Sequence, residues 1–216
     1  ADQVFPIVPV QKQSDLYFVY TKNDFLRDIA KPRAPGTESV GSGYNLSTTP
    51  YNAIVYAVHK DIDDQTRQNS DQPLDPEADA TIYVTNALLL RQEAQFVSDY
   101  MTTGVWGTDQ TVPITWDNWT SSDPITDIET GKQTILQNTG FMPNTMVLSY
   151  PVFWKLKHHP DIVDRFKYTN ADTVTEQMLA KLFGLKRMLV AAGAKATNNE
   201  GEAATYAFIH GKNALL

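Results

Sequence analysis

The chain of 216 residues contains no cysteine, so disulfides, thiolate zinc sites and cysteine nucleophiles are all excluded. Its stability must therefore come from packing alone. Positive charge is also scarce, because 18 Lys and Arg stand against 25 Asp and Glu, which gives a formal net charge of −7. Such a chain is expected to repel nucleic acid as a whole. The opening stretch, ADQVFPIVPV, has neither a basic region nor a long apolar run, so we expect no signal peptide and synthesis in the cytoplasm.

Sequence motifs of known enzyme chemistry are missing as well. The chain has no G-x-S-x-G elbow, no H-E-x-x-H pair and no glycine-rich phosphate loop that precedes a helix. Among the four histidines, His158 and His159 are adjacent, so they point to different sides of a helix and cannot chelate one metal together. We therefore expect no catalytic, metal-binding or cofactor-binding residues, and no enzyme activity.

An acidic run at residues 61–64 resembles the start of a calcium-binding EF-hand loop. That loop requires a glycine at its sixth position and a bidentate glutamate at its twelfth. Counted from Asp61, these positions hold Thr66 and Gln72, so the motif fails. We interpret the run as a solvated acidic face.

The dominant positive feature is a long amphipathic segment over residues 75–103. Asp75 and Pro76 form a helix start, with a carboxylate cap followed by a ring already fixed at helical φ. Apolar residues then recur in steps of three and four without an internal Gly or Pro. The pattern predicts one continuous helix over at least residues 78–100, roughly 40 Å long for the whole segment. On periodicity alone, it could equally be the central helix of an ordinary globular domain.

The segments before this helix are extended. Residues 1–14 carry two prolines and are predicted to form an arm or an edge segment. Residues 16–20 and 53–58 are predicted strands, separated by more than thirty residues rich in Pro and Gly. This separation is too long for a hairpin turn, so we favour a projecting two-stranded loop, with a substrate lid over residues 22–52 as the alternative. Short helices are expected within 23–30 and 59–73.

The segments after the helix are a mixture of short elements. Residues 104–122 are predicted to be an irregular connection with one β segment, whose tryptophans 106, 116 and 119 are buried anchors or, as an alternative, a sugar-binding platform. Helices are predicted over 124–140, over 151–157, from Pro160, and from Thr175 to Gly184. Strands are predicted over 145–148, 188–192 and 205–209, the last two joined by a polar loop over 198–202. The fold class is therefore α+β.

Several local strings resemble one family, the major capsid (coat) proteins of tailed bacteriophages, which have the Hong Kong ninety-seven fold. The strings lie along nearly the whole chain: PVQKQSDLY at 9–17, RAPGTE at 33–38, GFMPNT at 140–145, HPDI, DR and KYT within 159–169, and LAKLFG at 179–184. Each is moderately specific, and together they are more specific than any one alone.

This resemblance implies a domain organisation. Residues 1–14 would be the N-terminal arm and 15–60 the extended β-loop. Residues 61–110 would form the peripheral domain with the long spine helix, and 111–216 a mixed α/β axial domain. Family members usually continue well past a string such as FIHGK at 208–212, adding strands that complete both domains. We therefore expect either that a tail is missing after Leu216 or that another segment fills its place.

The resemblance also implies a function. The chain would be a structural protein of the virion that self-assembles into hexamers and pentamers of an icosahedral shell, built in the cytoplasm of a bacterial host. The shell would enclose double-stranded DNA without sequence-specific contacts, cofactors or a membrane, and decoration or scaffolding proteins would be further partners. An encapsulin-like protein nanocompartment is the alternative within the same fold, and a soluble enzyme with residues 22–52 as a lid is the alternative outside it.

Opposite charges suggest where subunits would meet. The first half of the 22–52 loop is basic and the approach to the long helix is acidic, so we expect the loop to lie over the acidic approach of the next subunit. The alternative is that both charge sets are simply solvated. The candidate contact residues are Lys22, Arg27, Lys31 and Arg33 in the loop, and Asp61, Asp63, Asp64, Asp75 and Glu77 in the approach.

Overall fold

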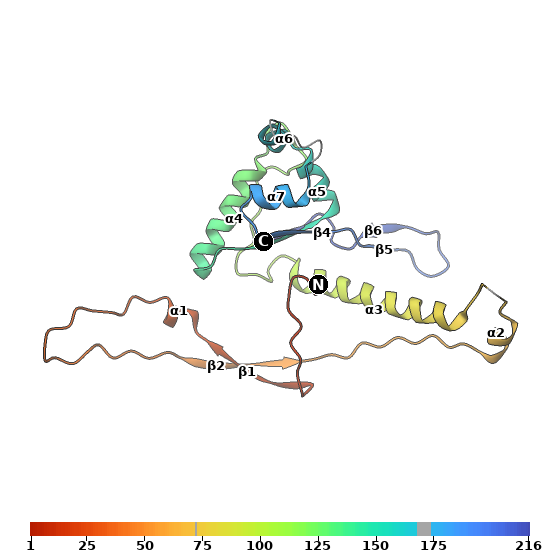
Figure 1. Cartoon of the computed structure of the whole chain (residues 1–216), viewed down its shortest axis with the longest axis horizontal. Coiled ribbons are helices and arrows are strands. Elements are labelled where there is room, and N and C mark those ends of the chain that lie inside the picture. The colour runs from red at the N-terminus through yellow and green to blue at the C-terminus, as the bar shows by residue number, and fades with distance from the viewer. Residues whose placement is uncertain (72, 168–173) are drawn as a thin grey trace. The chain divides into compact units, whose positions relative to one another are not determined.

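The computed structural model describes residues 1–71, 73–167 and 174–216 (Figure 1). The chain forms two compact units. The loop unit comprises Ile7–Ala57, and the main unit comprises Ala1–Pro6 together with Val58–Leu216. In the described part of the chain, no helix is long and apolar enough to cross a membrane.

The loop unit is built on one antiparallel pair of strands. β1 (Ser14–Tyr20) pairs with β2 (Leu46–Asn52), so that Ser14 lies opposite Asn52 and Tyr20 opposite Leu46. The short helix α1 (Lys22–Phe25) follows β1 directly, within the range predicted to contain a helix except for its first residue. The predicted two-stranded loop is therefore confirmed.

The predicted position of the second strand is wrong, because residues 53–58 follow β2 and form no strand. In the β1–β2 register, residues 53–57 would lie opposite residues 13–9, but the ladder continues past Asn52 through one further bond, from Ala53 N to Gln13 O. The β-branched residues of 53–58 raise strand propensity, but propensity alone does not decide which residues pair.

The main unit begins with the helices that precede its sheet. α2 (Asp64–Asn69) is followed by α3 (Pro76–Tyr100), 25 residues long, which confirms one continuous helix over residues 78–100. The Asp75 carboxylate accepts hydrogen bonds from the N–H groups of Glu77 and Ala78, at 3.1 and 3.2 Å. The helix ends at Tyr100, before the predicted end at 103.

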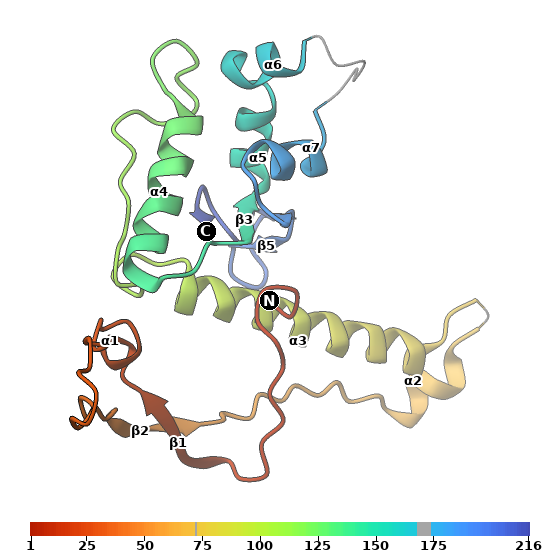
Figure 2. The ribbon, with the colours of Figure 1, turned by 60° about the vertical axis from the view of Figure 1, so that its left-hand side comes forward.

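A three-stranded sheet forms the centre of the remaining module. β3 (Thr145–Ser149) lies in the middle, parallel to β4 (Arg187–Ala191) and antiparallel to β7 (Ala214–Leu215). Figure 2 shows α4 (Pro124–Thr139) on one flank of this module. On the other flank lie α5 (Tyr150–Lys157), α6 (Pro160–Phe166) and α7 (Glu176–Leu182). The core between helices and sheet includes Ile128, Met146, Leu148, Leu156, Ile162, Leu179 and Phe183.

The two strands predicted at the end of the chain exist, but they do not pair with each other. β4 pairs with β3, whereas β6 (Tyr206–Phe208) pairs with β5 (Ala194–Ala196), which was not predicted. Ala-Lys-Ala has little strand propensity, so β5 depends on its partner for its conformation. The predicted α+β class is correct.

The interpretation of the tryptophan-rich connection is only partly correct. Residues 104–122 contain no strand. Trp106 and Trp119 keep 42% and 40% of their surface exposed, so they are not buried anchors. Trp116 packs against the core, and its indole N–H donates a hydrogen bond to Asp127 at 2.9 Å.

Candidate assembly surfaces

The β1–β2 ladder has one apolar face. Because side chains alternate along a strand, Leu16, Phe18 and Tyr20 lie on the same face, opposite Pro50 and Leu46. These side chains are exposed in the single chain, Phe18 by 69%. A two-stranded sheet is marginal in water unless a further layer covers it. The apolar loop face, which consists of Leu16, Phe18, Tyr20, Leu46 and Pro50, is therefore exposed to water in the single chain.

The end of the ladder is braced by an aromatic cluster. The rings of Tyr20, Phe25 and Tyr44 contact one another at centroid distances of 5.7 to 6.0 Å. Next to them, Asp24 accepts a hydrogen bond from Asn45 N at 2.8 Å, joining the two sides of the loop. These contacts hold the two sides of the loop unit together at this end of the ladder, whereas its apolar face is not covered.

The four basic residues predicted to form a contact are not equivalent. Arg27 lies 3.6 Å from Asp24, and the Arg33 guanidinium donates to the Thr37 carbonyl in its own turn. Lys22 and Lys31 are exposed and form no ion pair with any described residue. Only the two lysines are therefore free to meet a carboxylate of another molecule.

Two of the predicted acidic residues serve as helix caps. The Asp63 carboxylate accepts a hydrogen bond from Thr66 N at 2.9 Å and begins α2, and Asp75 begins α3. The hydrogen bonds from Thr66 lower the pKa of Asp63. These carboxylates already have intramolecular functions.

Two others share a partner that the sequence interpretation missed. Arg67 lies 3.2 Å from Asp64 and 2.9 Å from Glu77, so it joins α2 to the first turn of α3. The three-residue spacing of Asp64 and Arg67 on one helix was a signal that could have identified the first pair. Asp61 has only an exposed contact with His59, at 3.8 Å.

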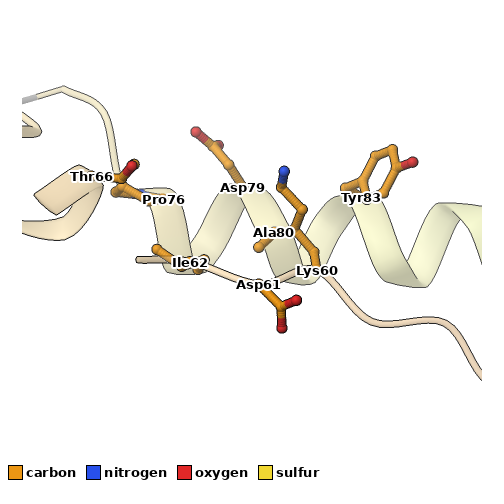
Figure 3. A pocket seen from close by; sticks show the side chains of 8 residues that line it. All are labelled: Lys60, Asp61, Ile62, Thr66, Pro76, Asp79, Ala80 and Tyr83. Atoms are coloured by element: carbon orange, nitrogen blue, oxygen red, sulfur yellow. The ribbon is translucent and has the colours of Figure 1, made fainter. Parts of the chain in front are cut away.

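A groove of about 570 Å³ lies where the approach segment runs beside the first turns of α3 (Figure 3). Its lining residues are Lys60, Asp61, Ile62, Thr66, Pro76, Asp79, Ala80 and Tyr83. Figure 3 shows the carboxylates of Asp61 and Asp79 pointing in opposite directions. No group of three or more metal-ligating side chains occurs in the described part of the chain. The groove is a surface of mixed polarity with two carboxylates at its walls, and one of them, Asp61, also lies 3.8 Å from His59.

The N-terminal residues of the chain pack against the last turns of α3. The ring of Phe5 contacts those of Phe96, Tyr100 and Trp106, at centroid distances of 6.0, 4.8 and 6.5 Å. Earlier on the helix, Ile82, Tyr83 and Leu89 are more than half exposed in the single chain. The long helix therefore buries its end and leaves much of its beginning uncovered.

A buried histidine connects the same helix to the end of the chain. His210 is 3% exposed, its ring contacts that of Phe96, and its Nε2 lies 3.7 Å from Glu93 Oε2. Glu93 Oε1 also accepts a hydrogen bond from the Ala1 amine at 2.6 Å. Burial lowers the pKa of His210, and its Nδ1 is buried without a hydrogen bond within the described structure. A single histidine without a motif gave no signal of this in the sequence.

Ser122, His159 and Asp161 are close together, but their hydrogen bonds differ from those of a catalytic triad. Asp161 N donates to His159 Nδ1 at 3.3 Å, so the ring proton is on Nε2. That proton is donated to Ser122 Oγ at 3.0 Å, while the Ser122 hydroxyl donates to Asn118 O at 2.7 Å. The serine therefore accepts from the imidazole and is not activated by it. The arrangement is a buried structural bridge.

Comparison with known proteins points to bacteriophages. No family model matches the sequence. A stretch of 69 residues, 32% of the chain, is 36% identical to the major capsid protein of Burkholderia phage BcepMu, of which it covers 22%. A phage-related protein from Bordetella bronchiseptica RB50 has the same fold, with a TM-score of 0.69 and 23% identity over 99% of this chain and 69% of that one. The capsid of cyanophage P-SCSP1u matches with a TM-score of 0.49 and 14% identity, over 94% of this chain and 67% of that one. The resemblance to phage capsid proteins is confirmed.

Proposed function

We propose that this chain is the major capsid protein of a tailed bacteriophage, a structural protein that self-assembles into hexamers and pentamers of an icosahedral shell. The observation that carries the proposal is the exposed apolar loop face, Leu16, Phe18, Tyr20, Leu46 and Pro50. Such a face is stable only where another surface removes it from water. The similarity to a phage major capsid protein supports another copy of the chain as that surface.

The proposed fold is that of the Hong Kong ninety-seven capsid proteins. In this assignment residues 1–14 are the arm, 15–60 the extended loop, 61–110 the peripheral domain and 111–216 the axial domain. The strand pair β1–β2 falls within the proposed loop, and α3 within the proposed peripheral domain. The three-stranded sheet and its core fall within the proposed axial domain.

The loop of one subunit is proposed to lie over the groove of the next. Lys22 and Lys31 supply exposed positive charge, and Asp61 and Asp79 supply negative charge at the groove, where Asp61 has an exposed contact with His59. Each exposed pair contributes only about 0 to 1 kcal/mol, so these charges set register while apolar burial supplies affinity. Because the contact repeats around every ring, the small free energies of the individual ion pairs add up.

The shell is proposed to enclose double-stranded DNA in the virion, after assembly in the host bacterial cytoplasm, with decoration or scaffolding proteins as further partners. A net charge of −7 favours an inner wall that encloses DNA without binding it tightly. No base-specific contacts are expected. The proposed role is structural, and it is supported by the hydrogen bonds at Ser122 and His159, in which the serine accepts from the imidazole.

The test is negative-stain microscopy of the expressed protein, combined with the ultraviolet absorbance ratio of the purified particles. Large closed particles that contain nuclease-protected DNA after phage infection support the proposal. Particles that contain a cargo protein instead would indicate a nanocompartment. A monomer with catalytic activity would overturn the proposal.

A further inference from the structure

The β5–β6 hairpin is a second strand pair with no cover. All six residues of its two strands are exposed, and Tyr206 keeps 74% of its surface exposed. Tyr206 and Phe208 share one face with Ala194 and Ala196. Phe208 stacks on Tyr150 at the start of α5, with ring centroids 6.2 Å apart, which fixes the base of the hairpin. Figure 1 shows the rest of it extending away from α4, α5, α6 and α7.

The tip of this hairpin is acidic and preformed. Asn198 Oδ1 accepts a hydrogen bond from Thr205 N at 3.2 Å, across the mouth of the turn. The Glu202 carboxylate accepts from Asn199 N at 3.2 Å and from its side-chain amide at 3.3 Å. Glu200 is exposed and forms no ion pair within the described ranges. The acidic tip, residues 198–202, is therefore ordered before it meets any partner.

A surface of the opposite charge lies at the end of α5. Lys155 Nζ lies between two indoles, 5.4 Å from the ring centre of Trp119 and 5.1 Å from that of Trp154. The Trp154 ring also contacts His158, at 5.2 Å. We name the basic–aromatic patch by its five residues, Trp119, Trp154, Lys155, Lys157 and His158.

The positive charge of Lys155 in this patch is partly compensated by Asp117. The pKa of Asp117 is lowered first by a hydrogen bond from Thr115 and also by the charges of Lys155 and Lys212. Lys157 has no such partner and forms no ion pair with a described residue. Lys157, three residues after Trp154 on α5, is therefore a cation on the same helix face without an ion pair among the described residues.

We propose that the acidic tip of one copy docks on the basic–aromatic patch of a second copy, with Tyr206 packed against the exposed indoles. Both halves belong to the same chain and are opposite in charge, and none of the hydrogen bonds or ion pairs of the described residues joins the tip to its own patch. A head-to-tail contact of this kind gives a ring where its rotation closes and an open filament where it does not. The inference rests on the proposed self-assembly, and adds a second contact separate from the β1–β2 loop.

Charge reversal on either side tests the contact. Glu200→Lys and Lys157→Glu alone are each expected to raise the protein concentration needed for assembly by about three- to tenfold at low salt. The double variant, Glu200→Lys with Lys157→Glu, restores opposite charges and keeps the original net charge. It is expected to assemble at close to the original concentration, an outcome that a merely structural role of either residue does not produce. Sedimentation velocity over a concentration series measures the effect.

A matched control reverses two exposed charges elsewhere, Asp164→Lys with Lys186→Glu, and is expected to assemble normally. Circular dichroism melts establish that every variant is folded. If the unmodified chain assembles and the single reversals do not weaken it, or if the double variant is not rescued, the tip does not dock on this patch. In either case the proposed function stands. If the unmodified chain never assembles, the proposed function fails and this contact fails with it.

Discussion

Leu16 of β1 lies directly opposite Pro50 of β2, which begins a row of apolar side chains on one face of the loop. The opposite face carries Tyr17 on the same strand, facing Thr49. The two faces thus offer a matched comparison within one strand. The opposite face also carries Val19 and Tyr51, which are half-buried, whereas the large apolar side chains of the first face are exposed.

Phe18→Thr is therefore predicted to abolish assembly without unfolding the subunit. Threonine retains strand propensity, and an exposed substitution of this kind changes the free energy of unfolding by only about 0.5 kcal/mol. Tyr17→Thr, on the other face, is the control and should assemble normally. Assembly of the two variants to the same extent would show that the apolar loop face is not a contact surface.

Lys22→Glu combined with Lys31→Glu is predicted to give folded subunits that fail to assemble at low salt, or that assemble only at high salt. The reversed charges would repel Asp61 and Asp79 of the next subunit, and salt screens this repulsion. Arg33→Glu is the control, because the Arg33 side chain bonds within its own turn. Unchanged assembly of the double variant at low salt would contradict the proposed contact between the loop and the groove.

His159→Ala is predicted to lower the free energy of unfolding by about 2 to 4 kcal/mol, because it leaves a cavity and unpaired groups in a buried site. Ser122→Ala should cost about 1 to 2 kcal/mol. Denaturant titration of both variants and of the double variant gives the coupling between them. Additive effects would contradict a direct hydrogen bond between the two side chains.

Acid is predicted to weaken the attachment of the 208–213 segment to α3. Burial lowers the pKa of His210 in the folded chain, with the charge of Glu93 opposing this and the Ala1 amine adding to it. Above the ordinary pKa of 6.5, both folded and unfolded chains hold this histidine neutral. As the pH falls below that value, the unfolded chain takes up a proton that the folded chain resists, so stability is lost.

Thermal melts between pH 8 and 5 (a range of about three units around the ordinary histidine pKa) measure this dependence. His210→Gln should flatten the curve. Equal curves for the unmodified chain and His210→Gln would contradict the assignment.

The isolated subunit is predicted to bind duplex DNA only weakly, since its net charge is −7. Electrophoretic mobility shifts over a series of salt concentrations provide the measurement. Tight binding that weakens steeply with salt would contradict an inner wall that releases DNA.

Local signals in the sequence predicted the helices well. The cap and proline at Asp75–Pro76 and at Asp123–Pro124 mark the beginnings of α3 and α4, and Gly140, at a φ of 75°, marks the end of α4. These signals work because capping involves residues only two or three positions apart. The same holds for Thr175 at the start of α7.

The features that were missed depend on residues far apart in the chain. Pairing with β1 selects residues 46–52 rather than the more β-branched 53–58, and this choice depends on a partner strand more than thirty residues away. Ser122 and His159 are 37 positions apart, and no motif relates them. Of the candidate contact residues, the Asp75 cap was predicted from the sequence, but the Asp63 cap and the pairing of Arg67 with Glu77 across two helices were not.

Self-assembly is tested most directly by sedimentation velocity of the purified chain, over a concentration series that starts well below assembly. The account predicts a concentration-dependent shift from the 24.2 kDa subunit to rings and then to large closed particles, and no such shift for Phe18→Thr. A single 24.2 kDa species at every concentration would contradict it.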